Sequence, residues 1–318
     1  MRQAVDGKDF GKMIWLPSSL RDWLDGQASQ LLYPAPSSAD YFLTPIGEPA
    51  LVSADSVSWH IFKNPVALFI GGISAVLLEL AHPSVRSGVW EHTSFRTHPR
   101  QRIQRTGFAA MVTVYAARSR AEEMIAAVGV MHRRIRGVTP SGVEYRADDP
   151  DLLTWVHATA AYGFLEAYHA FVHPLGDPQR DAFYAEGKTS ARLYGANNAP
   201  SSDAACKALC ENILPILESS DIVHEFLSIM AKTPLLPPPL SRLQPFLLNA
   251  AVHLVPKPVR GVLGLDMHWH FPSWQRALVT QAGRAADRIP MAHSPAVLSC
   301  RRLGLADNFL YRKWTSSR

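Results

Sequence analysis

The chain has 318 residues, of which 47% are hydrophobic and 19% are charged, a composition that suits a large buried core and excludes a mostly disordered chain. Its formal net charge is +5, from 32 basic and 27 acidic residues that do not gather in one tail, so we expect no nucleic-acid partner. Three cysteines without framework spacing exclude a disulfide-stapled secreted domain. Since the N-terminus also carries no readable secretory signal, we expect a cytoplasmic protein.

The chain is expected to be organised around one helical core. Residues 1–55 are mixed in character and contain a proline- and serine-rich loop, so we predict an N-terminal arm there. The predicted core covers 56–260, and 261–318 are expected to form a C-terminal helical extension packed on it. No internal repeat or low-complexity linker divides the sequence, so a single domain with peripheral elements is the simplest organisation.

The first clear helix is predicted to begin at Asn64, because an asparagine side chain accepts from free amides and Pro65 has no amide to leave unpaired. A proline ends this helix after His82. Its apolar stretch, 66–81, carries one charged residue, Glu79, and falls short of the roughly 20 apolar residues of a membrane span. We therefore predict a buried core helix and no transmembrane segment.

Two further helices are predicted from residues that recur at three- and four-residue spacing. The first begins near Pro99, and its periodic positions are Arg102, Arg105, Phe108, Ala109 and Val112. The second is predicted to start at a capping box of Ser119 and Glu122 and to stop at Gly137. Its apolar stripe also carries His132 and otherwise consists of Met124, Ile125, Val128, Met131 and Ile135.

A hairpin and a long helix are expected next. The turn Pro140-Ser141-Gly142 separates two short extended pieces, which are the only strand material predicted in the chain. Asp149 and Pro150 begin the next helix, which a proline ends after His173. One face of that helix carries His157 together with Leu153, Ala160, Phe164, Tyr168 and Phe171.

Common catalytic motifs are missing from the sequence. It contains no P-loop, no dinucleotide-binding glycine motif, no G-x-S-x-G elbow and no H-E-x-x-H, which argues against hydride transfer on a Rossmann fold and against zincin chemistry. Cys206 and Cys210 are four residues apart without a nearby histidine pair, unlike zinc ligands. His268 and His270 alternate as on a strand, but no further ligands accompany them, so we interpret them as loop residues.

His132 is the first candidate for a cofactor site. An imidazole on an apolar helix stripe is either a hydrogen-bonded core residue or an axial ligand of iron, and its spacing does not decide between the two. Arg136 follows one turn later, and a second group on the preceding helix contains Arg102, Arg105 and Thr106. Guanidinium forks suit paired carboxylates such as haem propionates, with a solvated basic face as the alternative.

Six fragments occur in order at plausible spacing. They are Leu80-Ala81-His82-Pro83; Gly88-Val89 with Glu91-His92 and Phe95; Arg102-x-x-Arg105-Thr106; His132-x-x-Ile135-Arg136-Gly137; Tyr145-x-Ala147-x-Asp149-Pro150; and Trp155-Val156-His157-Ala158-Thr159. Together they resemble the catalytic-domain family of mpaB and the rubber oxygenases, long catalogued as a domain of unknown function. Each fragment alone is unspecific, and the resemblance rests on their order across residues 60–260.

The resemblance implies an all-α fold, a single globin-like helical core with peripheral helices and one short hairpin-like excursion, which binds haem b and its iron. It implies relatives that cleave carbon–carbon double bonds of isoprenoid chains with dioxygen. The family's axial histidine matches His132, and its arginine and threonine near the haem match Arg102 and Thr106. His157 and His82 also belong to the pattern. Each is either the true ligand or, respectively, a hydrogen-bonding neighbour and a helix terminus.

The sequence departs from the rubber-cleaving relatives at one position. They carry a lysine beside that threonine, where this chain has Arg105, and a guanidinium that stays protonated cannot coordinate iron. The sixth site is therefore expected to hold water, dioxygen or nothing. Those relatives are also exported, whereas no secretory signal is readable in this sequence. We therefore expect a smaller lipid-like substrate than polymeric rubber.

The sequence thus predicts a haem-dependent oxygenase that acts with dioxygen on a small apolar, unsaturated, lipid-like molecule. As catalytic residues, Arg102 is expected to pair with a propionate or a substrate carboxylate, Thr106 to form a hydrogen bond near the haem edge, and Arg105 to give electrostatic support. His132, Arg136, His157 and His82 are expected to bind the cofactor, and a homodimer is left open. The alternatives are a haem protein without turnover, such as a gas sensor or haem carrier, and a cofactor-free helical interaction protein.

Overall fold

The structure is a computed structural model that describes residue 14 and the ranges 17–267 and 269–312. Helices dominate it, and a two-stranded antiparallel hairpin is the one sheet within these ranges. This confirms the predicted all-α fold class with its short hairpin-like excursion. His268, one of the two histidines weighed as a metal pair, lies outside the described residues.

The longest irregular segment between elements of the described ranges is 44–56, between the second and third α-helices. The N-terminal half contains α1 (Ser18–Leu32), the 3-10 helix η1 (Pro36–Ala39), α2 (Asp40–Leu43), α3 (Val57–Phe62), α4 (Pro65–Ala81), α5 (Pro83–Glu91), α6 (Pro99–Tyr115), α7 (Arg118–His132), β1 (Arg136–Val138), β2 (Glu144–Arg146) and α8 (Pro150–Phe171). The C-terminal half contains α9 (Asp177–Glu186), α10 (Lys188–Tyr194), α11 (Asp203–Ile213), η2 (Leu214–Ile216), α12 (Asp221–Lys232), η3 (Leu240–Leu243), α13 (Gln244–Leu254), α14 (Lys257–Val262), α15 (Ser273–Ala286), α16 (Pro295–Arg302) and η4 (Phe309–Tyr311).

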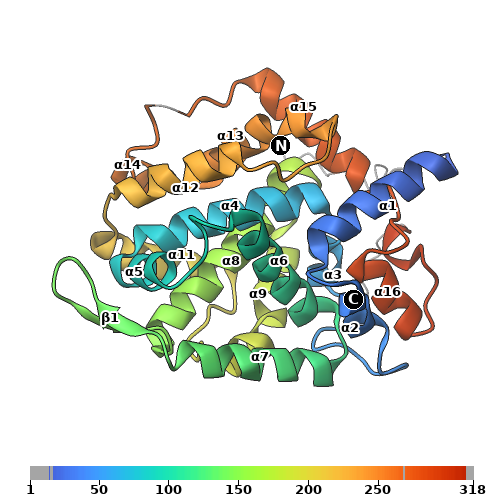
Figure 1. Ribbon diagram of the computed structural model, residues 1–318, viewed down its shortest axis with the longest axis horizontal. Coiled ribbons are helices and arrows are strands. Elements are labelled where there is room, and N and C mark those ends of the chain that lie inside the picture. Colours follow the sequence, from blue (N-terminus) through green and yellow to red (C-terminus); the bar gives the residue numbers. More distant parts are fainter. Residues whose placement is uncertain (1–13, 15–16, 268, 313–318) are drawn as a thin grey trace, which may run out of the picture.

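The centre of the fold is the crossing of α4 and α8, which pack on each other more extensively than any other pair of elements in the described ranges. Their backbones touch at two glycines: a Cβ atom added to Gly163 would lie 2.3 Å from the carbonyl oxygen of Gly71. On one side, α12, α13 and α15 pack against α4, and α13 and α15 also reach α8 (Figure 1). The two central helices are therefore enclosed by later segments of the chain.

Asn64 begins α4 as predicted. Its side-chain oxygen accepts from the amides of Val66 and Ala67 at 3.1 and 3.0 Å, and its nitrogen donates to the carbonyl of Gly283 at 2.9 Å. Among the described residues, no single helix has the length and apolar character to cross a membrane, and α4 and α5 reach both only as a pair bent by 112°.

Replacing Asn64 with alanine is expected to lower the free energy of unfolding by about 2–3 kcal/mol. The substitution removes the helix cap and leaves a buried carbonyl without its donor, so two losses add. Ser220→Ala is the matched control, because that residue caps only one amide of α12, at 3.3 Å, and should cost about 1 kcal/mol. Urea unfolding of both variants measures the difference, and equal losses would contradict this account.

The two predicted ends of α7 are wrong. The N-cap residue, Ala117, makes no side-chain cap, and the amide and hydroxyl of Ser119 donate to the carboxylate of Glu48, at 2.6 and 2.9 Å. A carboxylate from a distant loop thus replaces the predicted capping box with Glu122. The helix also ends at His132, and Gly137 lies in β1 rather than at a left-handed stop.

The predicted apolar stripe of α7 is only partly covered. Ile125 is buried, but Met131 keeps 53% of its surface exposed. The helix packs mainly on α6 and α10, and it runs along the side of the molecule opposite α13 and α15 (Figure 1). Its second half, which ends at His132, therefore has few side chains of the chain itself packed against it.

Candidate cofactor site

Arg102 on α6 has a charge that affects other candidate site residues. Burial lowers the pKa of its guanidinium, Glu79 opposes that shift, and Arg105 adds to it. The guanidinium carbon lies 5.2 Å from the ring centre of Phe95, and its charge also lowers the pKa of His132. Arg102 is therefore within electrostatic reach of both α4 and α7.

Glu79 was missed as a site residue by sequence reasoning. It is the one charged side chain of α4, and burial raises the pKa of its carboxyl to about 7, with Arg102 acting in the opposite direction. The residue nevertheless keeps some accessible surface. The carboxyl of Glu79 therefore lies in protein surroundings without being fully enclosed. The signal in the sequence was the single charge within an apolar helix.

The raised pKa of Glu79 predicts a pH dependence of stability. The pKa of Glu79 is about 7 in the folded protein, above the ordinary value of 4.5. The protonated carboxyl therefore contributes its full stabilisation of the folded state below pH 4.5. This contribution is lost as the pH rises through 7. Between pH 4 and pH 8, the free energy of unfolding of Glu79→Gln should therefore rise by about 3 kcal/mol relative to wild type. Urea unfolding across this range measures the change. Glu122→Gln, at an exposed position of α7, should show no such trend, and a flat difference for Glu79→Gln would contradict the burial argument.

His132 is the last residue of α7 and is half-buried. Burial is the largest cause of its lowered pKa, Arg102 lowers it further, and Asp148 opposes the shift. No hydrogen bond to its imidazole is found within the described ranges. The ring is therefore neutral at pH 7, and its lone pair is available to a ligand such as a metal ion.

The other two histidines face different surroundings. His157 lies on α8, and burial lowers its pKa to about 4. A Cβ atom on Gly187 would lie 3.2 Å from its Nε2, so this nitrogen faces the backbone where α9 meets α10. His82 joins α4 to α5 and is buried, and its Nδ1 has no hydrogen-bond partner in the described part of the chain. Burial, then the charge of Arg86, lowers the pKa of His82.

Three other predicted site residues are exposed at the surface. Arg105 and Thr106 are exposed on α6, and the Thr106 hydroxyl donates to the carbonyl of Arg102 at 2.9 Å, within the helix. Arg136 begins β1 and is also exposed. The structure thus brings Arg102 and His132 within electrostatic reach of each other, while Thr106 satisfies its hydroxyl locally.

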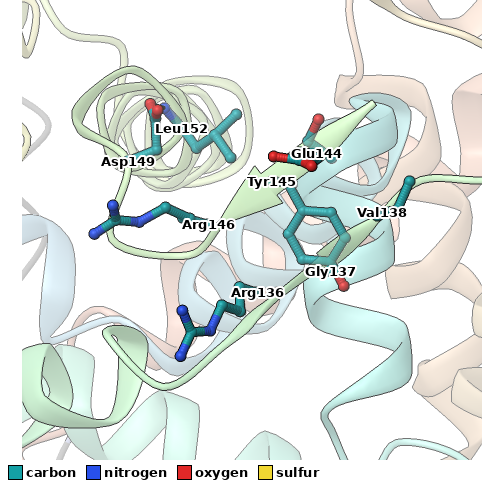
Figure 2. Close-up of a pocket in the computed structure, with 9 residues that line it drawn as sticks. Arg136, Gly137, Val138, Glu144, Tyr145, Arg146, Asp149 and Leu152 are labelled. Atoms are coloured by element: carbon teal, nitrogen blue, oxygen red, sulfur yellow. Dashed lines mark hydrogen bonds between the residues drawn. The ribbon is translucent and has the colours of Figure 1, made fainter. Parts of the chain in front are cut away.

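A pocket of about 690 Å³ lies where the hairpin meets the N-terminal ends of α5 and α8 (Figure 2). It is lined by Ser84, Arg136, Gly137, Val138, Glu144, Tyr145, Arg146, Asp149 and Leu152. The Tyr145 hydroxyl donates to Glu91 on α5 at 3.2 Å, and a Cβ atom on Gly137 would lie 2.7 Å from the same hydroxyl. A side chain at position 137 would therefore displace the tyrosine from its place across β1, where Tyr145 ties the hairpin to α5.

Comparisons with known proteins define the class. Residues 59–288 match the family described as the catalytic domain of ER-bound oxygenase mpaB/B'/Rubber oxygenase. The chain belongs to this family of oxygenase catalytic domains. The match runs from α3 to just past α15, further than the resemblance across 60–260. Family membership supports an oxygenase-type function with oxygen and a small-molecule substrate.

Two bacterial relatives are similar to the chain. An uncharacterized protein of Mycobacterium bovis and one of Mycobacterium tuberculosis are each 30% identical to it over 199 residues, which cover 60% of this chain and 78% of each relative. No solved structure matches the chain significantly.

Proposed function

We propose that the protein is a haem-b-dependent oxygenase that acts with dioxygen on a small apolar, unsaturated, lipid-like substrate. One observation carries the proposal: in a chain of an oxygenase family, the neutral imidazole of His132 lacks a protein partner in the described ranges and lies within electrostatic reach of Arg102. A neutral imidazole is a common axial ligand of haem iron.

The residues present fit a haem group. Glu79, Arg102, His132 and His157 come from α4, α6, α7 and α8, and burial shifts the pKa of each, yet each keeps accessible surface. Partial burial keeps these polar groups in protein surroundings while leaving each of them accessible to a ligand. The donor set suits the group as well, because imidazole binds iron and guanidinium pairs with propionates. Haem b bound there would supply redox-active iron that can take dioxygen.

Each side chain then has a distinct role in the proposal. His132 holds the iron, and Arg102 pairs with a propionate or a substrate carboxylate. Arg105 supports that charge, and the apolar helices α4 and α8 exclude water. Glu79 has a pKa of about 7, so its carboxyl can hold or release a proton near neutral pH.

The remaining predicted site residues have supporting or alternative roles in the proposal. Arg136 is a second candidate for a carboxylate of the cofactor, and Thr106 would support the haem edge from its position on α6. His157 and His82 remain the alternative axial ligands. Nε2 of His157 faces the backbone at Gly187, and His82 lies at the junction of α4 and α5.

Oxygen consumption tests the proposed function. Protein expressed with haem supplied is mixed with geranylgeraniol, an apolar isoprenoid probe, and oxygen uptake is followed together with loss of the alkene. The proposal expects uptake that depends on substrate and matches its loss. A haem absorption band without such uptake would favour a gas sensor or haem carrier, and the absence of any haem band would favour a cofactor-free interaction protein.

A further inference from the structure

The two strands of the hairpin place two arginines against each other. Arg136 on β1 is the direct partner of Arg146 on β2 in the antiparallel register. Like charges directly opposite each other destabilise a strand pair, and a bound anion between them would remove that cost. The register is secured elsewhere, because Tyr145 binds α5 from the other face of the hairpin.

The guanidinium groups keep unused donors. Arg146 donates from Nε and Nη2 to the Asp148 carboxylate at 3.0 and 2.9 Å, which leaves its Nη1 free. Arg136 has no acidic partner in the described ranges. Figure 2 shows both guanidinium groups on the same side of the hairpin, while the Glu144 carboxylate points away from them.

The nearest remaining acid does not neutralise these donors. The Asp149 carboxylate accepts from the amides of Asp151 and Leu152 at 2.9 and 3.2 Å, as the cap of α8. It is thereby committed to the helix, and the pocket still offers a two-arginine site for a planar anion. The open fork of Arg136 matches the geometry of a carboxylate, and the free Nη1 of Arg146 adds one further donor.

The pocket lining also includes an apolar side chain of α8. Leu152 lines it from the first turn of α8, the helix that carries His157. Arg136 lies four residues beyond His132, and Asp148, the partner of Arg146, acts electrostatically on His132. The arginines are therefore close to His132 along the chain, and the apolar part of a ligand that they hold would contact Leu152.

We propose that the hairpin pocket binds the carboxylate head of a long-chain amphiphile through Arg136 and Arg146, which makes the substrate an apolar chain with an acidic end. The reaction of that chain rests on the proposed oxygenase function, whereas the binding of its head does not. Arg102, which lies within electrostatic reach of the half-buried Glu79, is the guanidinium better placed for a haem propionate. The exposed hairpin pair is better placed for a ligand that enters from solvent.

Binding of two matched probes tests this proposal. Oleate and oleyl alcohol share one chain and differ in the head group, and isothermal titration below their micellar concentrations gives their affinities for the full-length, haem-supplied protein. Oleate should bind about tenfold more tightly than the alcohol, as expected for charge-assisted hydrogen bonds. Arg136→Gln and Arg146→Gln should each remove most of this preference. Arg134→Gln, a neighbouring exposed arginine outside the pocket lining, should retain it.

Three results would overturn the proposal. The first is equal affinity of the wild-type protein for the two probes, and the second is an equal loss of the oleate preference in Arg134→Gln. The third is an unchanged oleate preference in Arg136→Gln and Arg146→Gln together with a lost haem band. The last would assign the two arginines to haem propionates. An oleate preference that depends on Arg136 in protein without a haem band would support the pocket and contradict only the proposed oxygenase function.

Discussion

Replacing His132 with alanine is expected to abolish the binding of haem, with loss of the haem absorption band and a haem content at least tenfold below that of wild type. The substitution removes the one imidazole that is neutral, free of hydrogen bonds in the described ranges and within electrostatic reach of Arg102. Because His132 is only half-buried at the end of α7, its loss should leave the fold intact. Circular dichroism checks the fold, and the absorption spectrum measures the haem.

The other two candidate histidines provide the controls. His157→Ala should retain the haem band, since its Nε2 faces the backbone at Gly187. His82→Ala should also retain the band, because this residue lies at the junction of α4 and α5. A retained band in His132→Ala together with a lost band in His157→Ala would move the iron to α8 and contradict the assignment.

Gly163→Ala is expected to lower the free energy of unfolding by about 2–4 kcal/mol, a large fraction of the stability of an ordinary domain. The new Cβ atom would lie 2.3 Å from the carbonyl oxygen of Gly71 and 3.2 Å from the amide nitrogen of Ala75. Relief requires α4 and α8 to move apart, which opens the centre of the core. This cost exceeds the gain of about 1 kcal/mol that alanine brings within a helix.

A matched glycine separates the two effects. Gly26 lies within α1, and a Cβ atom there would meet nothing within 4 Å. Gly26→Ala should therefore leave stability unchanged or raise it by up to about 1 kcal/mol. Urea unfolding of both variants measures the contrast, and a stabilised Gly163→Ala would show that the two helices do not approach each other at this point.

Features specified by neighbouring residues could be predicted from the sequence. Asn64 with Pro65 and Asp149 with Pro150 begin α4 and α8, because a side-chain cap and a missing amide act within one turn. The turn between the two extended pieces likewise predicted the hairpin. Each of these signals lies within a few residues of the structure that it specifies.

Features that depend on distant parts of the chain could not be predicted. The start of α7 depends on Glu48, 71 residues before Ser119, and its predicted capping box was therefore wrong. The approach of Gly71 to Gly163 joins helices far apart in the sequence. The hairpin was predicted, but the register that places Arg136 opposite Arg146 was not.

The candidate site was predicted in part. Its histidines and arginines were chosen from motif order, and their assignment to haem stays a prediction. The effect of Glu79 on Arg102 was not foreseen, because it depends on how α4 lies against α6. In the sequence, the same glutamate served only as an argument against a membrane span.

A haem titration of the purified wild-type protein tests the central proposal most directly. The absorbance of the haem band is followed as haem is added to protein prepared without it. The proposal predicts a sharp endpoint at one haem per chain, with the spectrum of a histidine-ligated iron. A spectrum that stays that of free haem throughout the titration would contradict it.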